Sequence, residues 1–240
     1  MKLEVENITK KYKDKTAVDN VSITFTPGVW GLLGANGAGK TTLMRMIAGI
    51  MEPTEGKILY DGVPIETLQG EYRRIFGYLP QEFGFYPEFN VQDYLEYMAA
   101  LKGMPKREAK RKIDELLEQV SLSEVRKKKI VKLSGGMKKR LSIACAIARD
   151  PQVLILDEPG ASLDIVCKED IKNYLRSYVN TGNTVIIASH ETGELELCDR
   201  IYLMAGGRLT ELEFLRRSVR SSADIADTLI RYIRIPEVRQ

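Results

Sequence analysis

The sequence predicts an α/β fold in which a core of buried strands is joined by a small antiparallel sheet and a helical insert. Residues 1–26 alternate apolar and polar side chains between turn residues, which is the pattern of an antiparallel sheet. Two continuous apolar runs, 153–156 and 185–188, have the length of strands and are typical of parallel strands buried on both faces. Residues 91–148 repeat apolar side chains at helical spacing, which indicates a helical insert.

A glycine-rich loop over residues 34–41 carries the strongest functional signal. It reads Gly-Ala-Asn-Gly-Ala-Gly-Lys-Thr and fits the pattern G-x-x-x-x-G-K-[ST] of a phosphate-binding loop. A strand over 29–33 leads into it and a helix over 42–48 leads out, so backbone N–H groups and the helix dipole would both face the phosphates. We expect Lys40 to reach the β- and γ-phosphates and the Thr41 hydroxyl to bind Mg²⁺. The residues expected to bind the nucleotide here are Gly34, Asn36, Gly37, Ala38, Gly39, Lys40, Thr41 and Thr42.

Polar residues follow three predicted strands, and ligands of open α/β sheets gather at the carboxyl ends of strands. Asp157 and Glu158 follow the run 153–156: we expect Asp157 to bind Mg²⁺, and Glu158, on the other side of the strand, to polarise the attacking water. Gln81 follows a short apolar strand and can touch Mg²⁺ or the water, although a solvated loop residue is the default reading. His190, the only histidine, ends the predicted strand 184–190 and could hydrogen-bond a γ-phosphate.

Two further segments admit a functional and a structural reading. Tyr12 could stack on an adenine ring or merely cover a sheet edge. Ser134, Gly135 and Gly136 precede a helix predicted over 138–149 and could hold an oxyanion, or Ser134 could be an ordinary N-cap. A second anion site has no obvious use in a single chain, but it would have one if two copies faced each other.

Composition bounds the class of protein. The length of 240 residues suits one or two domains, and a net charge of +3 is too small to argue for a nucleic-acid partner. Three widely spaced cysteines favour buried thiols in a reducing cytosol over a metal site. No stretch approaches the roughly 18 apolar residues of a membrane span, so we expect the protein not to cross a membrane itself. Residues 102–140 hold fourteen Lys and Arg against five Asp and Glu, which we interpret as a solvated helical surface rather than a face for acidic headgroups or an acidic partner.

With these motifs in this order, residues 1 to about 210 resemble the ATP-binding subunit of an ABC transporter. Residues 34–41 match the Walker A loop, and 153–158 match Walker B with its catalytic glutamate. Residues 133–136 match the ABC signature, which distinguishes this family from other phosphate-loop proteins. Tyr12, Gln81, the D-loop 162–164 and the switch histidine His190 fall in the family's order. The sequence departs from the family at Met137, where a glutamine is usual and a hydrogen-bonding side chain is lost.

The resemblance implies a P-loop NTPase core with an antiparallel β-subdomain. It implies one ATP-binding domain over 1–210, with a helical subdomain at about 86–150, and a short tail over 211–240. The implied activity is ATP hydrolysis coupled to transport, with ATP and Mg²⁺ as cofactors. The catalytic residues would be Glu158, His190, Gln81 and Lys40, the metal ligands Thr41, Gln81 and Asp157, and the further ATP contacts Tyr12, Ser134, Gly135, Gly136 and Asp164.

The resemblance also implies partners. Two cassettes, identical or paralogous, would sandwich two ATP molecules, each held by one chain's Walker A loop and the other's Ser134 and Gly136. The Gln81 loop and the helical subdomain would contact a separately encoded membrane-spanning permease, which would hold the protein at the cytoplasmic face of the membrane. Residues 77–103 look most like those of bacterial drug, antibiotic or peptide exporters. An importer cassette, or a soluble or regulatory ABC ATPase, is the alternative.

Overall fold

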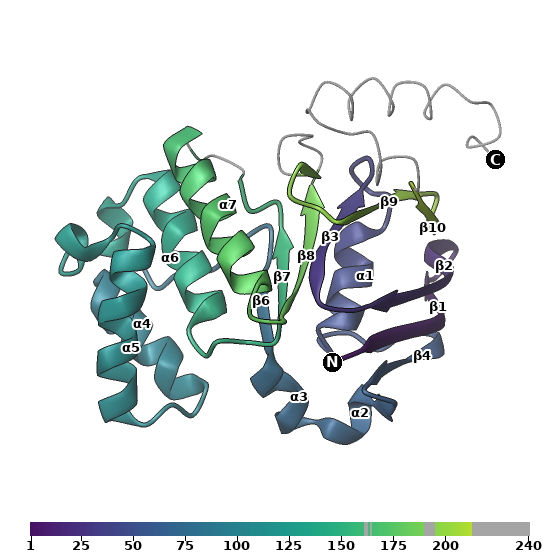
Figure 1. Ribbon diagram of the computed structural model, residues 1–240, viewed down its shortest axis with the longest axis horizontal. Helices are drawn as coiled ribbons and strands as arrows, with labels where there is room; N and C mark the ends of the chain where they lie inside the picture. Colours follow the sequence, from purple (N-terminus) through teal and green to yellow (C-terminus); the bar gives the residue numbers. More distant parts are fainter. Residues whose placement is uncertain (161–162, 164, 190–194, 213–240) are drawn as a thin grey trace. The chain divides into compact units, whose positions relative to one another are not determined.

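The computed structural model describes residues 1–160, 163, 165–189 and 195–212. The described residues form two compact units, one within residues 1–69 and from 184 onward and the other within residues 70–183 (Figure 1). The predicted Asp164, His190 and tail beyond residue 212 lie outside the described residues.

The first unit contains an antiparallel sheet and a mostly parallel set of strands. Its elements are β1 (Leu3–Tyr12), β2 (Lys15–Phe25), β3 (Gly28–Leu33), α1 (Lys40–Ile47), β4 (Glu55–Tyr60), β5 (Val63–Pro64), α2 (Ile65–Leu68), β8 (Thr184–Ser189), β9 (Arg200–Ala205) and β10 (Arg208–Glu211). The antiparallel sheet has the order β2-β1-β4-β5, with Leu3 opposite Phe25, as the alternation of residues 1–26 predicts. β3 lies between β8 and β9 and is parallel to both.

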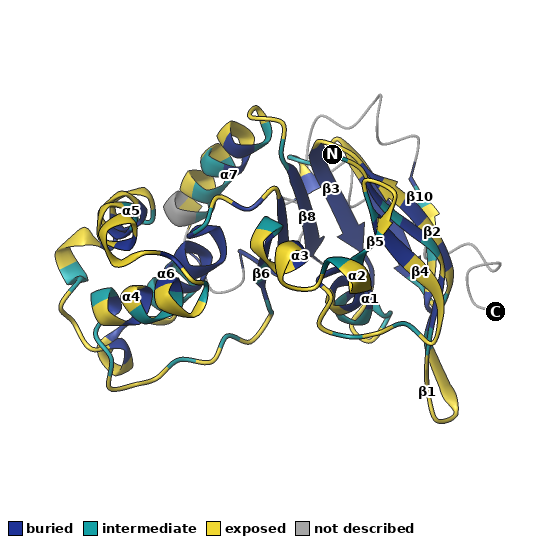
Figure 2. Ribbon diagram, turned by 90° about the horizontal axis from the view of Figure 1, so that it is seen from below, coloured by how far each residue is buried: buried dark blue, intermediate teal, exposed yellow. Residues whose placement is uncertain are grey.

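Burial follows the sequence pattern in this unit. Every residue of β3 and of β8 is buried, as expected for central parallel strands, and Figure 2 shows both in the buried colour. The two strands pair in register from Gly28 opposite Thr184 to Leu33 opposite Ser189. A central, buried β3 therefore gives the loop that follows Leu33 a rigid starting point.

The second unit contains a parallel strand pair and most of the helices. Its elements are α3 (Gly70–Ile75), β6 (Phe76–Leu79), α4 (Val91–Leu101), α5 (Lys106–Gln119), two short 3₁₀ helices η1 (Ser123–Val125) and η2 (Ile130–Lys132), α6 (Gly135–Ile147), β7 (Val153–Asp157) and α7 (Ile165–Val179). β6 and β7 are parallel, and α4 packs against both α5 and α6. The expected helical character of residues 91–148 is confirmed, while the predicted bounds of a helical subdomain at about 86–150 stay a prediction.

Two helices begin earlier than the sequence predicts. α6 begins at Gly135 rather than at residue 138, because the Ser134 side chain caps it and the two glycines adopt helical geometry. α1 begins at Lys40 rather than at residue 42. Among the described residues, no helix is both long and apolar enough to cross a membrane.

Candidate nucleotide-binding and hydrolysis site

The glycine-rich loop runs from the end of β3 to the first residue of α1, as the sequence predicts. A side chain at Gly34 would collide with the backbone oxygen of Met204, and one at Gly39 would collide with that of Ala17. Gly39 caps α1 with a φ of 109°, a conformation that favours glycine. The loop is therefore held close to neighbouring backbone while its N–H groups lie at a helix N-terminus, the geometry that binds anions.

Lys40 is the first residue of α1 and is nearly buried, with 6% of its surface exposed. Its Nζ donates to the carbonyl oxygens of Gly34 at 2.6 Å and Ala35 at 3.1 Å. A buried ammonium is stable only when its charge is solvated by such partners. The lysine thus lies within the loop that is expected to bind phosphate, and phosphate oxygens can replace the two carbonyls as stronger, charged acceptors.

Tyr12 is the last residue of β1 and 43% of its surface is exposed. Its hydroxyl donates to the sulfur of Met51 at 2.9 Å, and the ammonium of Lys10 lies over the ring, 5.7 Å from its centroid. An exposed ring held at its hydroxyl end can present a face to a base. No local sequence pattern could identify Met51 as a partner of Tyr12, because the two residues are 39 positions apart in the chain.

In the second unit, the register of β6 and β7 brings Gln81 and Glu158 together. Leu79 lies opposite Leu156 in the parallel pair, and each predicted site residue follows two positions later. Nε2 of Gln81 donates to Oε2 of Glu158 at 3.1 Å. Two residues that are 77 positions apart in the chain thus form one polar contact at the carboxyl end of the strand pair.

We expected Asp157 and Glu158 to alternate along one extended strand, but they do not. β7 ends at Asp157, which is 2% exposed, and Glu158 has a φ of 52°, in the left-handed region. Strained backbone of this kind is concentrated at functional sites. The two carboxylates are therefore separated by a turn of the chain, and Glu158 is directed by that turn and by its bond to Gln81.

Ser134 caps α6: its hydroxyl accepts a hydrogen bond from the backbone N–H of Met137 at 3.2 Å. The structural reading of this serine is thus confirmed within the chain. Ser134 and Gly135 are exposed, and open space surrounds the position of a side chain at Gly135. An exposed helix N-terminus of this kind is compatible with an anion supplied from outside the chain.

A cluster of six aromatic rings follows Gln81, and no motif in the sequence pointed to it. The rings are those of Phe83, Phe85, Tyr86, Phe89, Tyr94 and Tyr97, with neighbouring centroids 5.0 to 6.5 Å apart. Tyr94 is buried, and desolvation raises its pKa to about 12, whereas Tyr86 is 54% exposed. The high density of aromatic residues over 83–97 is the sequence feature from which this cluster could have been predicted. The cluster presents an apolar surface beside the Gln81 loop.

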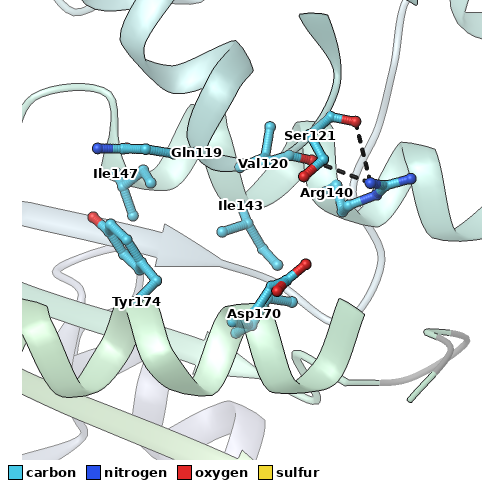
Figure 3. A pocket seen from close by; sticks show the side chains of 9 residues that line it. Gln119, Val120, Ser121, Arg140, Ile143, Ile147, Asp170 and Tyr174 are labelled. Carbon is cyan, nitrogen blue, oxygen red and sulfur yellow. Dashed lines mark hydrogen bonds between the residues drawn. The ribbon is translucent and has the colours of Figure 1, made fainter. Parts of the chain in front are cut away.

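A separate small pocket, open to solvent, lies between α6, α7 and the end of α5 (Figure 3). Arg140 of α6 donates to the backbone oxygens of Val120 and Ser121 at 3.3 and 3.2 Å, bonds drawn dashed in Figure 3. Ile143, Ile147 and Tyr174 provide apolar lining. None of the predicted site residues lines this pocket, and Arg140 fastens α6 to the end of α5 rather than presenting its charge to a ligand.

The glycine-rich loop, the buried lysine and the Gln81–Glu158 contact agree with a comparison against known families. The family described as ABC transporter matches residues 18–161, which is more than half of the chain. The chain belongs to the ABC transporter family. The resemblance inferred from the motifs is confirmed, and with it the α/β phosphate-loop fold and an ATP-hydrolysing activity.

Curated relatives of this ABC protein are named as ATP-binding proteins. It is 38% identical over 214 residues to the lipopolysaccharide export system ATP-binding protein LptB of Haemophilus influenzae, covering 86% of this chain and 88% of the relative. It is 39% identical over 208 residues to the Nod factor export ATP-binding protein I of Rhizobium etli, covering 86% of this chain and 66% of the relative. For the uncharacterized ABC transporter ATP-binding protein YhaQ of Bacillus subtilis, the identity is 38% and the coverage 86% and 69%.

Solved structures agree with the sequence relatives. An ATP-binding subunit of an ABC transporter superposes with a TM-score of 0.83 at 26% identity, covering 96% of this chain and all of the other. The cassette MJ0796, in a dimeric post-hydrolysis state bound to ADP and Pi, superposes with a TM-score of 0.80 at 25% identity, covering 90% of this chain and all of the other. The ABC cassette described here therefore binds ATP, and its dimeric neighbours are compatible with the predicted pairing of two cassettes.

Proposed function

We propose that this ABC cassette hydrolyses ATP to drive export through a separately encoded membrane-spanning subunit. The contact between Gln81 and Glu158 carries the proposal, because it joins the residue that activates water to the loop that leads into the aromatic surface. A partner that moves this loop would change the position of the carboxylate. Relatives named for Nod factor export and lipopolysaccharide export support export over import.

Each residue of the hydrolytic site has a distinct role in this proposal. Lys40 exchanges its carbonyl partners for the β- and γ-phosphates, so its charge is already positioned when ATP binds. Glu158 orients the attacking water or accepts its proton, while Gln81 holds the carboxylate and releases it when the loop moves. His190 and Asp164, which lie outside the described residues, would steady the γ-phosphate and line the paired site.

The side chains predicted to bind Mg²⁺ carry the oxygen atoms that this ion prefers. This ion prefers oxygen ligands, keeps several waters and binds through one or two carboxylates together with substrate phosphates. Thr41 offers a hydroxyl, Asp157 a carboxylate, and Gln81 its amide oxygen, since the amide nitrogen is bonded to Glu158. No cluster of three His, Cys, Asp or Glu side chains that could hold a metal occurs among the residues that the structure describes. When bound, Mg²⁺ would neutralise charge on the phosphate oxygens.

A second cassette completes the site in this proposal. The exposed N-terminus of α6, with Ser134, Gly135 and Gly136, would bind the γ-phosphate of ATP held by the partner cassette. Ser134 already accepts one backbone hydrogen bond, and a hydroxyl keeps both a donor proton and a second lone pair for a phosphate oxygen. Met137 adds no hydrogen bond from its side chain, so the backbone and Ser134 carry this contact.

The aromatic cluster is the surface that we assign to the membrane-spanning subunit. It begins two residues after Gln81 and extends onto α4, and its exposed member is Tyr86. Aromatic rings dominate the energetics of protein interfaces because they bury large apolar areas. Docking of the partner at this surface would hold the cassette at the cytoplasmic face of the membrane.

Co-purification tests the transport assignment. The chain is tagged in its native host, the membranes are solubilised in mild detergent, and the proteins that accompany the tag are identified. A stoichiometric membrane-spanning protein is expected, and Tyr86→Ala should weaken its recovery. Leu101→Ala is the matched control, because Leu101 is 63% exposed at the end of α4, the helix onto which the aromatic cluster extends, but belongs to no ring contact. A chain that stays in the cytosol, alone or with ribosomes, would contradict the transport assignment while leaving ATP hydrolysis intact.

A further inference from the structure

Tyr12, the residue predicted to stack on adenine, contacts a methionine in the segment that follows α1. The hydroxyl of Tyr12 donates to the sulfur of Met51 at 2.9 Å. Met51 lies four residues after α1, the helix that begins at Lys40 in the glycine-rich loop. The N-terminal end of α1 thus carries the predicted phosphate contacts, and the segment after its C-terminal end contacts the Tyr12 ring.

The position of Met51 is fixed from its N-terminal side by the end of α1. The N–H of Ile50 donates to the carbonyl of Arg45 at 3.0 Å and that of Gly49 to Met46 at 3.0 Å, with Gly49 at a φ of 67°. This is the Schellman arrangement, which closes a helix in a defined geometry. The N–H of Met51 itself donates to the Arg45 carbonyl at 3.2 Å.

The following residues are fixed by bonds to β1. The N–H of Thr54 donates to the carbonyl of Thr9 at 2.8 Å, and the N–H of Lys11 donates to the Thr54 hydroxyl at 3.1 Å. Lys10 donates through Nζ to the carbonyl of Glu52 at 2.6 Å, and the same ammonium lies over the Tyr12 ring. Residues 51–54 therefore connect the end of α1 to the strand that carries Tyr12, with Met51 at the ring.

We propose that Met51 is a positioning residue for the nucleotide base: its sulfur fixes the Tyr12 ring so that the base stacks on the face opposite Lys10. The inference rests on the predicted stacking of Tyr12 on the adenine of the ATP that the cassette is proposed to hydrolyse. α1 spans eight residues, or about 12 Å at 1.5 Å per residue, and acts as a spacer between the phosphate end and the base end of the site. Because the Tyr12 hydroxyl donates its proton to sulfur, it does not donate to the base, and we assign the ring the role of stacking.

Binding of ATP and of inorganic tripolyphosphate, which lacks a base, tests the proposal on the purified full chain by calorimetry. Met51→Ala should weaken ATP binding about fivefold, because part of the stacking energy of one base is lost. Tripolyphosphate binding should be unchanged. Met51→Leu keeps the side-chain volume but removes the sulfur acceptor, so a smaller loss is expected. In a Tyr12→Phe background, which lacks the hydroxyl, Met51→Leu should cost nothing further.

Substitutions at Tyr12 and Met51 distinguish the stacking role of Tyr12 from the positioning role of Met51. If Tyr12→Ala leaves ATP binding unchanged, the stacking proposal fails. If Tyr12→Ala weakens ATP binding but Met51→Ala does not, only the positioning role of Met51 is overturned. Equal losses of ATP and tripolyphosphate binding in Met51→Ala would also overturn it, because they would indicate a general effect on the fold of the unit.

Discussion

Nε2 of Gln81 lies 3.1 Å from Oε2 of Glu158, and this contact follows from the register of two parallel strands. Leu79 and Leu156 are paired, so the loops that leave β6 and β7 emerge side by side. The amide of Gln81 donates a hydrogen bond to the charged carboxylate of Glu158. Because the amide itself is neutral, breaking this bond leaves no unpaired charge on Gln81. The contact therefore suits a residue that must both orient Glu158 and release it.

Gln81→Ala should lower the turnover number of ATP hydrolysis about tenfold, the effect of losing one hydrogen bond to a charged group. ATP affinity should change much less, since most phosphate contacts belong to the glycine-rich loop. Steady-state hydrolysis and equilibrium ATP binding measure the two quantities. Gln119→Ala, which removes an exposed glutamine from the same unit, is the control. Full turnover in Gln81→Ala would show that the contact has no role in catalysis.

Lys40→Ala should abolish measurable nucleotide binding, because it removes a buried charge from the loop that faces the phosphates. Calorimetry with ATP measures the effect. Arg45→Ala is the matched control: Arg45 is an exposed cation on the same helix, and its backbone carbonyl, not its side chain, closes the helix end. Unchanged ATP affinity in Lys40→Ala would count against the phosphate-loop assignment.

Gly39→Ala should destabilise the fold by about 3 kcal/mol, from left-handed backbone and steric overlap together. The new side chain would meet the backbone oxygen of Ala17 and the terminal carbon of Met204. Gly37→Ala is the comparison, because Gly37 has a φ of 80° but nothing within 4 Å of a side chain, so about 1 kcal/mol of backbone strain is expected. Denaturant unfolding compares the two, and equal destabilisation would refute the steric argument.

The sequence predicted the local motifs of the site because each motif depends on residues that are close together in the chain. The loop over 34–41 needs only its glycines, a strand before it and a helix after it, and the structure contains all three. Ser134 was likewise recognised as a possible N-cap, and it is one. The alternation of residues 1–26 predicted a real antiparallel pair, β1 and β2.

Contacts between distant segments could not be predicted in this way. Gln81 and Glu158 meet because of strand register, which no local pattern encodes, and Tyr12 meets Met51 across 39 residues. The expected alternation of Asp157 and Glu158 was wrong, because the chain turns into the left-handed region at Glu158. Strain at one residue is a property of its tertiary environment, so an argument from strand periodicity could not reveal it.

The most direct test of the account is the activity of Glu158→Gln. The substitution keeps the size of the side chain, and its amide oxygen can still accept the bond from Gln81, but the base is lost. We predict that ATP binds with near-normal affinity and is hydrolysed at least ~10²-fold more slowly, the scale of losing a general base. Near-normal turnover in this variant would contradict the account, because it would remove Glu158 from the chemistry that the cassette performs.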